Sequence, residues 1–174
     1  MKIKNLKGKE YFLILLALVV IIVLFNITIY KIYWVPSNSM ENIIKENDFT
    51  YVYQLPYILN YGDPDYEEVL VFKYPVKKEY DYVKRLIGKP GDLIHIKNNK
   101  VFRNDIEIIE SYLPPSIIME DFGPVLVPKD SYFFMGDNRN RSSDSREWGF
   151  VDYSLIKGKV ISIIWPLERA GVIK

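Results

Sequence analysis

Cysteine is absent from the 174 residues of the chain, and histidine occurs only once, as His95. Without thiols, neither a disulfide framework nor thiolate chemistry is available. A zinc site with two or more histidine ligands is likewise excluded, and no sequence pattern signals a carboxylate metal site, so we expect no metal and no cofactor. The 23 basic and 22 acidic residues give a net charge of +1, which provides no electrostatic basis for binding nucleic acid.

Charge is also missing from residues 11–30, YFLILLALVVIIVLFNITIY, which form one apolar run. At about 1.5 Å per residue, a helix of about 20 residues spans roughly 30 Å, the thickness of the hydrocarbon core of a bilayer. A cleaved secretory signal would have a shorter apolar region followed by small residues, whereas Lys31, Tyr33 and Trp34 follow this run. The pattern therefore favours an uncleaved transmembrane anchor over a cleaved signal.

Basic residues gather on the N-terminal side of the apolar run. The first ten residues contain four lysines and one acid: Lys2, Lys4, Lys7, Lys9 and Glu10. Positively charged flanks remain in the cytoplasm. We therefore expect a single-pass membrane protein with a cytoplasmic N-terminus at 1–10, an anchor at 11–30 and an extracytoplasmic domain at 31–174.

The remainder of the chain is rich in short runs of β-branched and aromatic residues, separated by turn sequences such as GKPGD and GDNRN. The runs are 49–54, 68–73, 80–87, 92–97, 100–108, 131–135 and 158–165. A hairpin that turns at Asn98 and Asn99 is expected, as is one helical turn capped by Asp152. Since no amphipathic helix of useful length appears, the predicted fold is mainly β, an antiparallel and barrel-like assembly behind one membrane helix.

Two serines follow the apolar run closely, in VPSNSM at residues 35–40. A serine hydroxyl becomes a nucleophile at neutral pH only when a base lies beside it. The usual base is histidine, but His95 lies in the strand-like sequence DLIHIK, where a partly exposed strand residue is the simpler interpretation. The other available base is a neutral lysine, whose pKa must fall from about 10.4 by several units through burial or a nearby cation.

Lys84 differs from most lysines of the chain, because it lies within the apolar, strand-like sequence YDYVKRLIG at residues 80–88. Strand alternation places Lys84 and Arg85 on opposite faces, so one of the two should point to the core. A lysine can be buried in its neutral form, whereas an arginine cannot lose its proton. The charge of Arg85 is expected to lower the pKa of Lys84 further. By itself, this context leaves a solvated lysine on an edge strand as the default interpretation.

Four segments occur in order behind the apolar run: PSNSM (36–40), VLVFKYP (69–75), YVKRLIGKPGD (82–92) and GDNRNRSSDSREWGFV (136–151). Together they resemble the signature segments of the bacterial type I signal peptidases, membrane-bound Ser-Lys proteases that remove signal peptides. The resemblance covers the anchor and nearly the whole outer domain. It implies two antiparallel sheets with a barrel-like core, and a serine endopeptidase that cleaves exported preproteins after small residues at the bacterial plasma membrane.

The resemblance also implies roles for individual residues. Ser39 matches the nucleophile and Lys84 matches the general base. Ser37 matches the serine whose hydroxyl helps the Ser39 backbone N–H to hold the oxyanion. Ser142 matches the serine that forms a hydrogen bond with the lysine amine and orients it.

Further along the same segment, Asp144 and Arg146 match a charged pair that braces the site. The chain departs from the family directly after the nucleophile. Asn42, Ile43 and Ile44 stand where the family usually has Pro-Thr-Leu. The proline would stiffen the turn after Ser39, so the local geometry of this turn is left open.

Two alternative functions stay open on the sequence alone. A Ser-Lys autoprotease of the SOS-repressor type would carry a DNA-binding module in place of the anchor and would cut its own chain upstream of the serine. A membrane-tethered, non-catalytic β domain would instead bind exported proteins, but the joint presence of Ser37, Ser39, Lys84 and Ser142 argues against it. The expected partners are the signal peptides of secretory preproteins and the lipid bilayer, with no nucleic acid, and the protein is expected to be a monomer.

Overall fold

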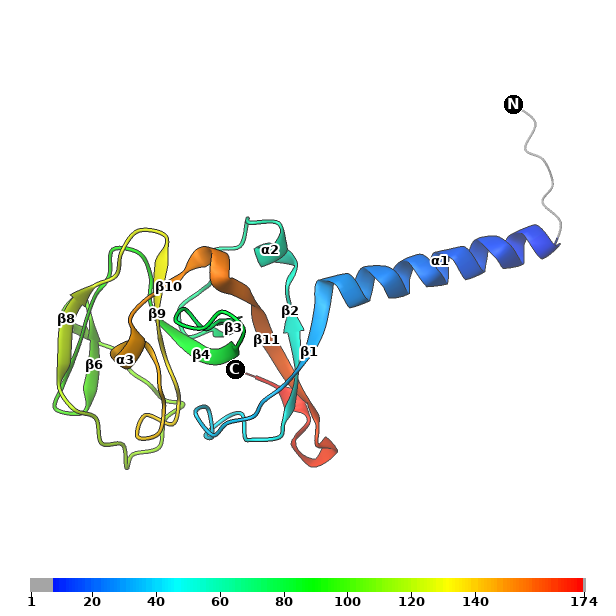
Figure 1. Cartoon of the computed structure of the whole chain (residues 1–174). Helices are drawn as coiled ribbons and strands as arrows, with labels where there is room; N and C mark the ends of the chain where they lie inside the picture. The colour runs from blue at the N-terminus through cyan, green and yellow to red at the C-terminus, as the bar shows by residue number, and fades with distance from the viewer. Residues whose placement is uncertain (1–7, 174) are drawn as a thin grey trace.

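The computed structural model of the chain describes residues 8–173. It consists of one long helix, α1 (Gly8–Ile29), that projects from a β-rich body (Figure 1). The helix is long and apolar enough to cross a membrane, and all of its residues except Ile29 are exposed. It contains all but the last residue of the predicted run at 11–30. Three of the lysines that suggested its orientation, Lys2, Lys4 and Lys7, lie outside the described residues.

The larger of two sheets has eight strands in the order β1-β2-β11-β3-β4-β9-β10, with β12 paired to β11. All of its neighbouring strands are antiparallel. The strands are β1 (Tyr30–Trp34), β2 (Phe49–Tyr53), β3 (Val69–Lys73), β4 (Asp81–Gly88), β9 (Ser131–Met135), β10 (Val151–Asp152), β11 (Ile156–Trp165) and β12 (Gly171–Val172). The predicted mainly β, antiparallel fold is confirmed.

The smaller sheet has four strands in the order β7-β6-β5-β8. They are β5 (Leu93–Lys97), β6 (Lys100–Arg103), β7 (Ile106–Glu107) and β8 (Phe122–Leu126). The predicted hairpin turn is confirmed, since Asn98 and Asn99 connect β5 to β6 with φ of 51° and 64°. Asparagine tolerates this left-handed conformation better than most residues do. Strand β8 was not predicted, because Gly123 and Pro124 resemble a turn; the proline is accommodated because β8 is an edge strand.

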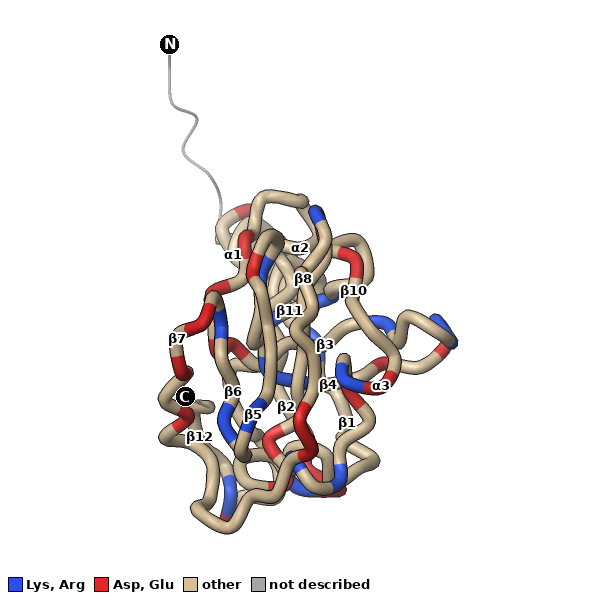
Figure 2. The backbone as a smooth tube through the Cα atoms, turned by 90° about the vertical axis from the view of Figure 1, so that its left-hand side faces the viewer, with Lys and Arg blue, Asp and Glu red and all other residues tan. Residues whose placement is uncertain are grey.

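Short helices connect the strands: α2 (Leu55–Ile58), α3 (Ser145–Trp148), η1 (Tyr153–Leu155) and η2 (Leu167–Arg169). The predicted helical turn capped by Asp152 is confirmed as η1, because the Asp152 carboxylate accepts a hydrogen bond of 2.8 Å from the Ser154 N–H. Acidic and basic residues both occur across the side of the body that Figure 2 shows, in keeping with a net charge of +1.

Strand β4 is covered on both faces, which corrects one prediction. Leu86 packs into one apolar cluster with Phe72 and Phe134, whereas Ile87 packs into another with Ile94. We expected only one of Lys84 and Arg85 to point inward. Both are buried, with 3% and 1% of their surfaces exposed, because the smaller sheet packs on one face of the strand and an apolar cluster of the larger sheet covers the other.

Candidate active site

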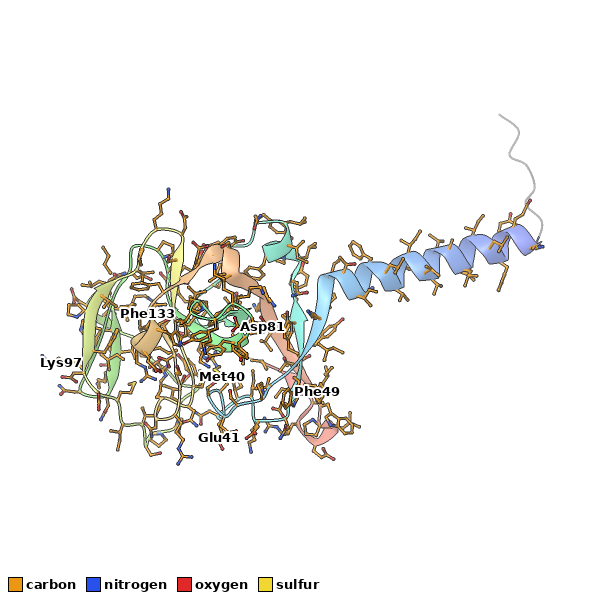
Figure 3. All side chains as sticks on the ribbon, viewed as in Figure 1. Met40, Glu41, Phe49, Asp81, Lys97 and Phe133 are labelled. Carbon is orange, nitrogen blue, oxygen red and sulfur yellow. The ribbon has the colours of Figure 1, made fainter. Side chains whose placement is uncertain are left out.

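Ser39 lies in a tight turn between β1 and β2. The turn is closed by hydrogen bonds from Glu41 N to Asn38 O and from Ile43 N and Ile44 N to Met40 O. The fully buried side chains of Met40 and Ile44 fix it to the core, and Figure 3 shows Met40 within the body and Glu41 toward its lower surface. The hydroxyl of Ser39 is thereby presented beside the middle of β4.

Lys84 and Ser39 meet across 45 residues of sequence. The Lys84 Nζ donates a hydrogen bond of 2.6 Å to the Ser39 Oγ and another of 3.1 Å to the Val83 carbonyl oxygen. The Tyr82 ring lies 5.2 Å from the same nitrogen. In the part of the chain that the structure describes, no ion pair involves Lys84. A serine hydroxyl thus lies within hydrogen-bond distance of a buried amine that has no charged partner among the described residues.

Burial lowers the pKa of Lys84 from 10.5 to about 8, because the interior disfavours the ammonium form. The negative charges of Asp144 and Asp137 oppose this shift. The charge of Arg85, which we expected to assist, is not among the causes. Its guanidinium is instead neutralised by two hydrogen bonds with the Asp137 carboxylate, of 2.9 and 2.6 Å.

The Ser37 hydroxyl lies at the mouth of the site, 3.3 Å from the Ser39 Oγ. Both serines line a cleft of about 250 Å³, together with residues 81–84 and with Arg141 and Ser143. One edge of β4 is unpaired along this cleft. β9 pairs only with residues 85–88, while β3 occupies the other edge from Asp81 to Arg85. The free edge offers main-chain groups to an extended peptide.

Ser142 packs close to Ser39, on the other side of Gly136. A Cβ on Gly136 would overlap both the Ser142 Oγ and the Ser39 carbonyl oxygen, so only glycine fits between them. The Ser142 Oγ is buried and forms no hydrogen bond with the described residues. The hydrogen bond to Lys84 that the resemblance implied is therefore not formed in this structure.

Asp144 and Arg146 form a pair at the start of α3. The guanidinium donates two hydrogen bonds of 2.8 Å to the carboxylate, one to each oxygen. The fully buried carboxylate also accepts from the N–H groups of Gly136 and Arg146. The pair therefore joins α3 to the loop that follows β9, directly behind Ser142.

Sequence reasoning missed a second group of buried charges. Asp137 binds Arg85, and Arg139 binds the Glu110 carboxylate, which also accepts from the Tyr112 hydroxyl. Asp137 stands in the segment GDNRN, but only its pairing with a residue 52 positions away shows its role. His95 stacks on Phe102 in the smaller sheet, at 4.8 Å between ring centroids, and remains a partly exposed strand residue as predicted.

Comparison with known proteins defines the class to which this fold and this site belong. Residues 8–165 match the family described as signal peptidase, peptidase S26. The chain belongs to this family and is a serine peptidase of the signal peptidase I type. The predicted family and enzyme class are confirmed.

Individual relatives show how far the similarity extends. A probable signal peptidase I-2 of Synechocystis sp. is 36% identical over 147 residues, which cover 80% of this chain and 65% of that protein. A signal peptidase I P of Bacillus subtilis subsp. natto is 35% identical over 166 residues, which cover 90% of this chain and 88% of that protein. The crystal structure of a signal peptidase I from Enterococcus faecalis V583 matches with a TM-score of 0.51 at 28% identity, and covers 56% of this chain and 97% of that chain.

Proposed function

We propose that this chain removes signal peptides from exported preproteins, with Ser39 as the nucleophile and Lys84 as the general base. The observation that carries the assignment is the 2.6 Å contact between the Lys84 Nζ and the Ser39 Oγ. It lies in a buried environment that lowers the pKa of Lys84 to about 8, so a substantial neutral fraction exists near physiological pH. A base works best when its pKa lies near the operating pH.

The reaction follows from this pairing. The neutral Lys84 amine takes the proton of the Ser39 hydroxyl while the Oγ attacks the scissile carbonyl carbon. The resulting ammonium gives this proton to the departing amine, which leaves an ester on Ser39. Neutral again, Lys84 removes a proton from a water molecule that attacks the ester, and then returns the proton to the Ser39 Oγ.

Negative charge on the carbonyl oxygen needs fixed donors in both steps. We assign this role to the Ser37 hydroxyl and the Ser39 N–H, since both serines line the cleft. The Asp144–Arg146 pair holds the wall behind them. Ser142 is assigned as the residue that orients the amine, through a hydrogen bond that would form during the reaction.

The shape of the cleft supports an extended substrate with small side chains. A peptide that adds to the free edge at residues 81–84 would run past Ser39 and Lys84 as an additional strand. A cleft of about 250 Å³ is smaller than most ligand sites, which hold roughly 300–1,000 Å³. Such a cleft favours residues such as alanine before the scissile bond.

The membrane arrangement is part of the proposal: residues 1–10 in the cytoplasm, 11–30 across the bilayer and 31–174 outside it. An aromatic row on the outer face of the larger sheet supports it. The register aligns Trp34 of β1 with Phe49 of β2 and Phe49 with Trp165 of β11. Both tryptophans are more than half exposed, at 55% and 54%, and Figure 3 labels Phe49 at this end of the sheet. Such rings prefer the membrane interface.

Incubation of the detergent-solubilised protein with a preprotein that carries an Ala-x-Ala site tests the function. We expect one cut directly after the second alanine, mapped by sequencing the new N-terminus, and no cut with Ser39→Ala. An intact preprotein after incubation with the wild type would refute the proposal.

Protease added outside spheroplasts tests the topology: it should digest the 31–174 domain, and protection of this domain would reverse the orientation.

A further inference from the structure

Several contacts tie the turn that carries Ser39 to the loop after β9, among them two hydrogen bonds from the Asn138 side chain, to the Asn38 carbonyl oxygen and to the Glu41 carboxylate. On the side of the nucleophile, the Asn138 N–H donates to the Ser39 carbonyl oxygen at 3.0 Å. On the far side, the Asn42 side-chain amide donates to the Asp137 carbonyl oxygen at 2.9 Å. Asn42 stands three residues after Ser39, so the contacts of these two residues hold the turn at both of its ends.

The residue that accepts from Asn42 also holds the strand of the base. The carbonyl oxygen of Asp137 binds the Asn42 amide, while its carboxylate binds the Arg85 guanidinium through two hydrogen bonds. Arg85 is further fixed by a hydrogen bond of 2.7 Å to the Glu67 carbonyl oxygen and by the Tyr112 ring, 3.9 Å away. Asp137 and Arg85 are buried, at 0% and 1% exposed, so this connection is rigid.

These contacts close a ring through the active site. From Ser39 the path runs along the turn to Asn42, crosses to Asp137, crosses again to Arg85 and continues to its neighbour Lys84. The hydrogen bond between Lys84 and Ser39 completes it. Two crossings of the ring are single hydrogen bonds, Lys84 to Ser39 and Asn42 to Asp137, and only the second can be removed without changing the reacting pair.

We propose that Asn42 is a positioning residue of the reaction: its amide fixes the turn of the nucleophile to Asp137 and thereby sets the distance between Ser39 and Lys84. The inference rests on the proposed function of that pair. It also explains how the chain tolerates the loss of the proline that is usual at this position. The hydrogen bond replaces the stiffness of a proline ring with an anchor to the loop after β9.

The backbone around Asn42 allows a direct test by substitution. The turn hydrogen bonds use the N–H groups of Glu41, Ile43 and Ile44, and none of the recorded bonds among residues 8–173 uses the N–H of Asn42. Asn42→Pro therefore removes the side-chain amide without removing a hydrogen bond of the turn. The proline ring instead restricts the φ angle of the backbone at this position. Asn42→Ala removes the amide and adds no constraint.

A matched control is available on the same loop. Asn140 is also exposed, and its side-chain oxygen accepts one hydrogen bond of 3.1 Å from the Ile118 N–H. Asn140→Ala thus removes one hydrogen bond between an exposed asparagine and the main chain, and this bond does not involve the turn of Ser39. Comparison with this variant separates a loss of positioning from a general loss of one surface contact.

The first measurement is steady-state cleavage of a preprotein by the full-length protein in detergent, with active sites counted by the burst of product. We expect Asn42→Ala to lower kcat about three- to tenfold with KM changed less than twofold, because the substrate edge at 81–84 is untouched. Asn42→Pro should recover most of the loss, and Asn140→Ala should match the wild type. An unchanged kcat in Asn42→Ala, or a loss confined to KM, would overturn the proposal.

The second measurement is hydrogen exchange of the peptide that covers residues 36–44, which needs no catalytic activity. Asn42→Ala should speed exchange of this peptide several-fold, whereas Asn42→Pro and Asn140→Ala should leave it close to the wild type. Equal protection in Asn42→Ala and wild type would refute the positioning role. Should the wild type cleave no preprotein while exchange responds as expected, the function assignment would fail and the structural tie would stand.

Discussion

Two neighbouring cations on β4 have opposite surroundings. Lys84 and Arg85 are both buried, but their side chains leave the strand on opposite faces. Arg85 meets a carboxylate and an aromatic ring, from Asp137 and Tyr112. Lys84 meets neutral groups, the hydroxyl of Ser39, the carbonyl of Val83 and the Tyr82 ring. A cation that cannot lose its proton is paired, whereas one that can lose its proton is left unpaired.

This difference fits the roles proposed for the two residues, Lys84 as the general base and Arg85 as a structural ion-pair partner. A buried carboxylate beside Lys84 would stabilise the ammonium and raise its pKa, which would remove the base at neutral pH. The carboxylates of Asp137 and Asp144 do act in that direction, but each is engaged with an arginine, and burial prevails. The two arginine pairs thus supply rigid walls while leaving the amine of Lys84 without a direct counter-charge.

Substitution of the proposed nucleophile, Ser39, or of the proposed base, Lys84, should have the largest effect on activity. We expect Ser39→Ala and Lys84→Ala each to lower kcat by on the order of 10⁴- to 10⁶-fold, with no further loss in the double variant, because the two residues act as one unit. Lys84→Arg should be equally inactive, since a guanidinium cannot accept the proton. Single-turnover cleavage of a preprotein measures these losses, and circular dichroism checks folding. Appreciable cleavage by Lys84→Arg would exclude proton transfer to this residue.

Breaking the ion pair of Arg85 should unfold the protein more readily. Arg85→Met leaves the Asp137 carboxylate buried and unpaired, and should lower the free energy of unfolding by about 3–5 kcal/mol. The double variant Arg85→Met with Asp137→Leu should recover most of this loss, because no buried charge remains. Urea titration of the three proteins gives both values. A loss below about 1 kcal/mol in the single variant would show that the pair is solvated.

Ser37, the proposed oxyanion donor, should affect the rate without changing the pKa of Lys84. Ser37→Ala removes one hydroxyl from the mouth of the cleft and should lower kcat by roughly 10²- to 10³-fold, about 2.7–4 kcal/mol. The acid limb of its pH profile should coincide with that of the wild type, because Lys84 keeps its burial and its contacts. A displaced acid limb would instead show that Ser37 influences the pKa of the Lys84 amine.

Substitution of Lys84 by an apolar residue should stabilise the fold, in contrast to substitution of Arg85. The pKa of Lys84 is about 8 in the folded chain against 10.5 ordinarily, so the unfolded chain binds more protons between these values, and the stability of the wild type rises with pH across this window. Below it, the buried amine costs about 3 kcal/mol. Lys84→Met should therefore gain up to about 3 kcal/mol at pH 7, and this gain should shrink as the pH rises toward 10.5. Urea titration at several pH values measures it, and a variant less stable at pH 7 would contradict the cost of burial.

Much of the fold could be predicted, because its strands carry local signals. The aromatic and β-branched runs marked most strands of both sheets, and the asparagines at 98 and 99 marked a turn. Strand β1 was missed because Tyr30 to Trp34 follow the apolar run directly and resemble residues of a membrane interface. Strand β8 was missed because the residue pair Gly123-Pro124 is typical of turns.

The contacts within the site were harder to predict, because they join residues that are distant in the sequence. That Lys84 lies in an apolar strand was visible in sequence, but its pairing with Ser39 came from resemblance to a family. The burial of Arg85 was not foreseen, because it depends on the second sheet packing on the other face of β4. Contacts such as Asn42 with Asp137 join residues 95 positions apart, and no periodicity or propensity encodes such a pair.

The acid limb of the pH profile tests most directly whether Lys84 is the buried, unpaired base. The measurement is kcat/KM for preprotein cleavage from pH 6 to 10.5, which reports the pKa values of the free enzyme. The account predicts that activity rises with pH through a midpoint near 8, the pKa that burial gives Lys84. A midpoint near 10.5, the ordinary lysine value, would contradict it, because the amine would then be solvated and charged throughout the physiological range.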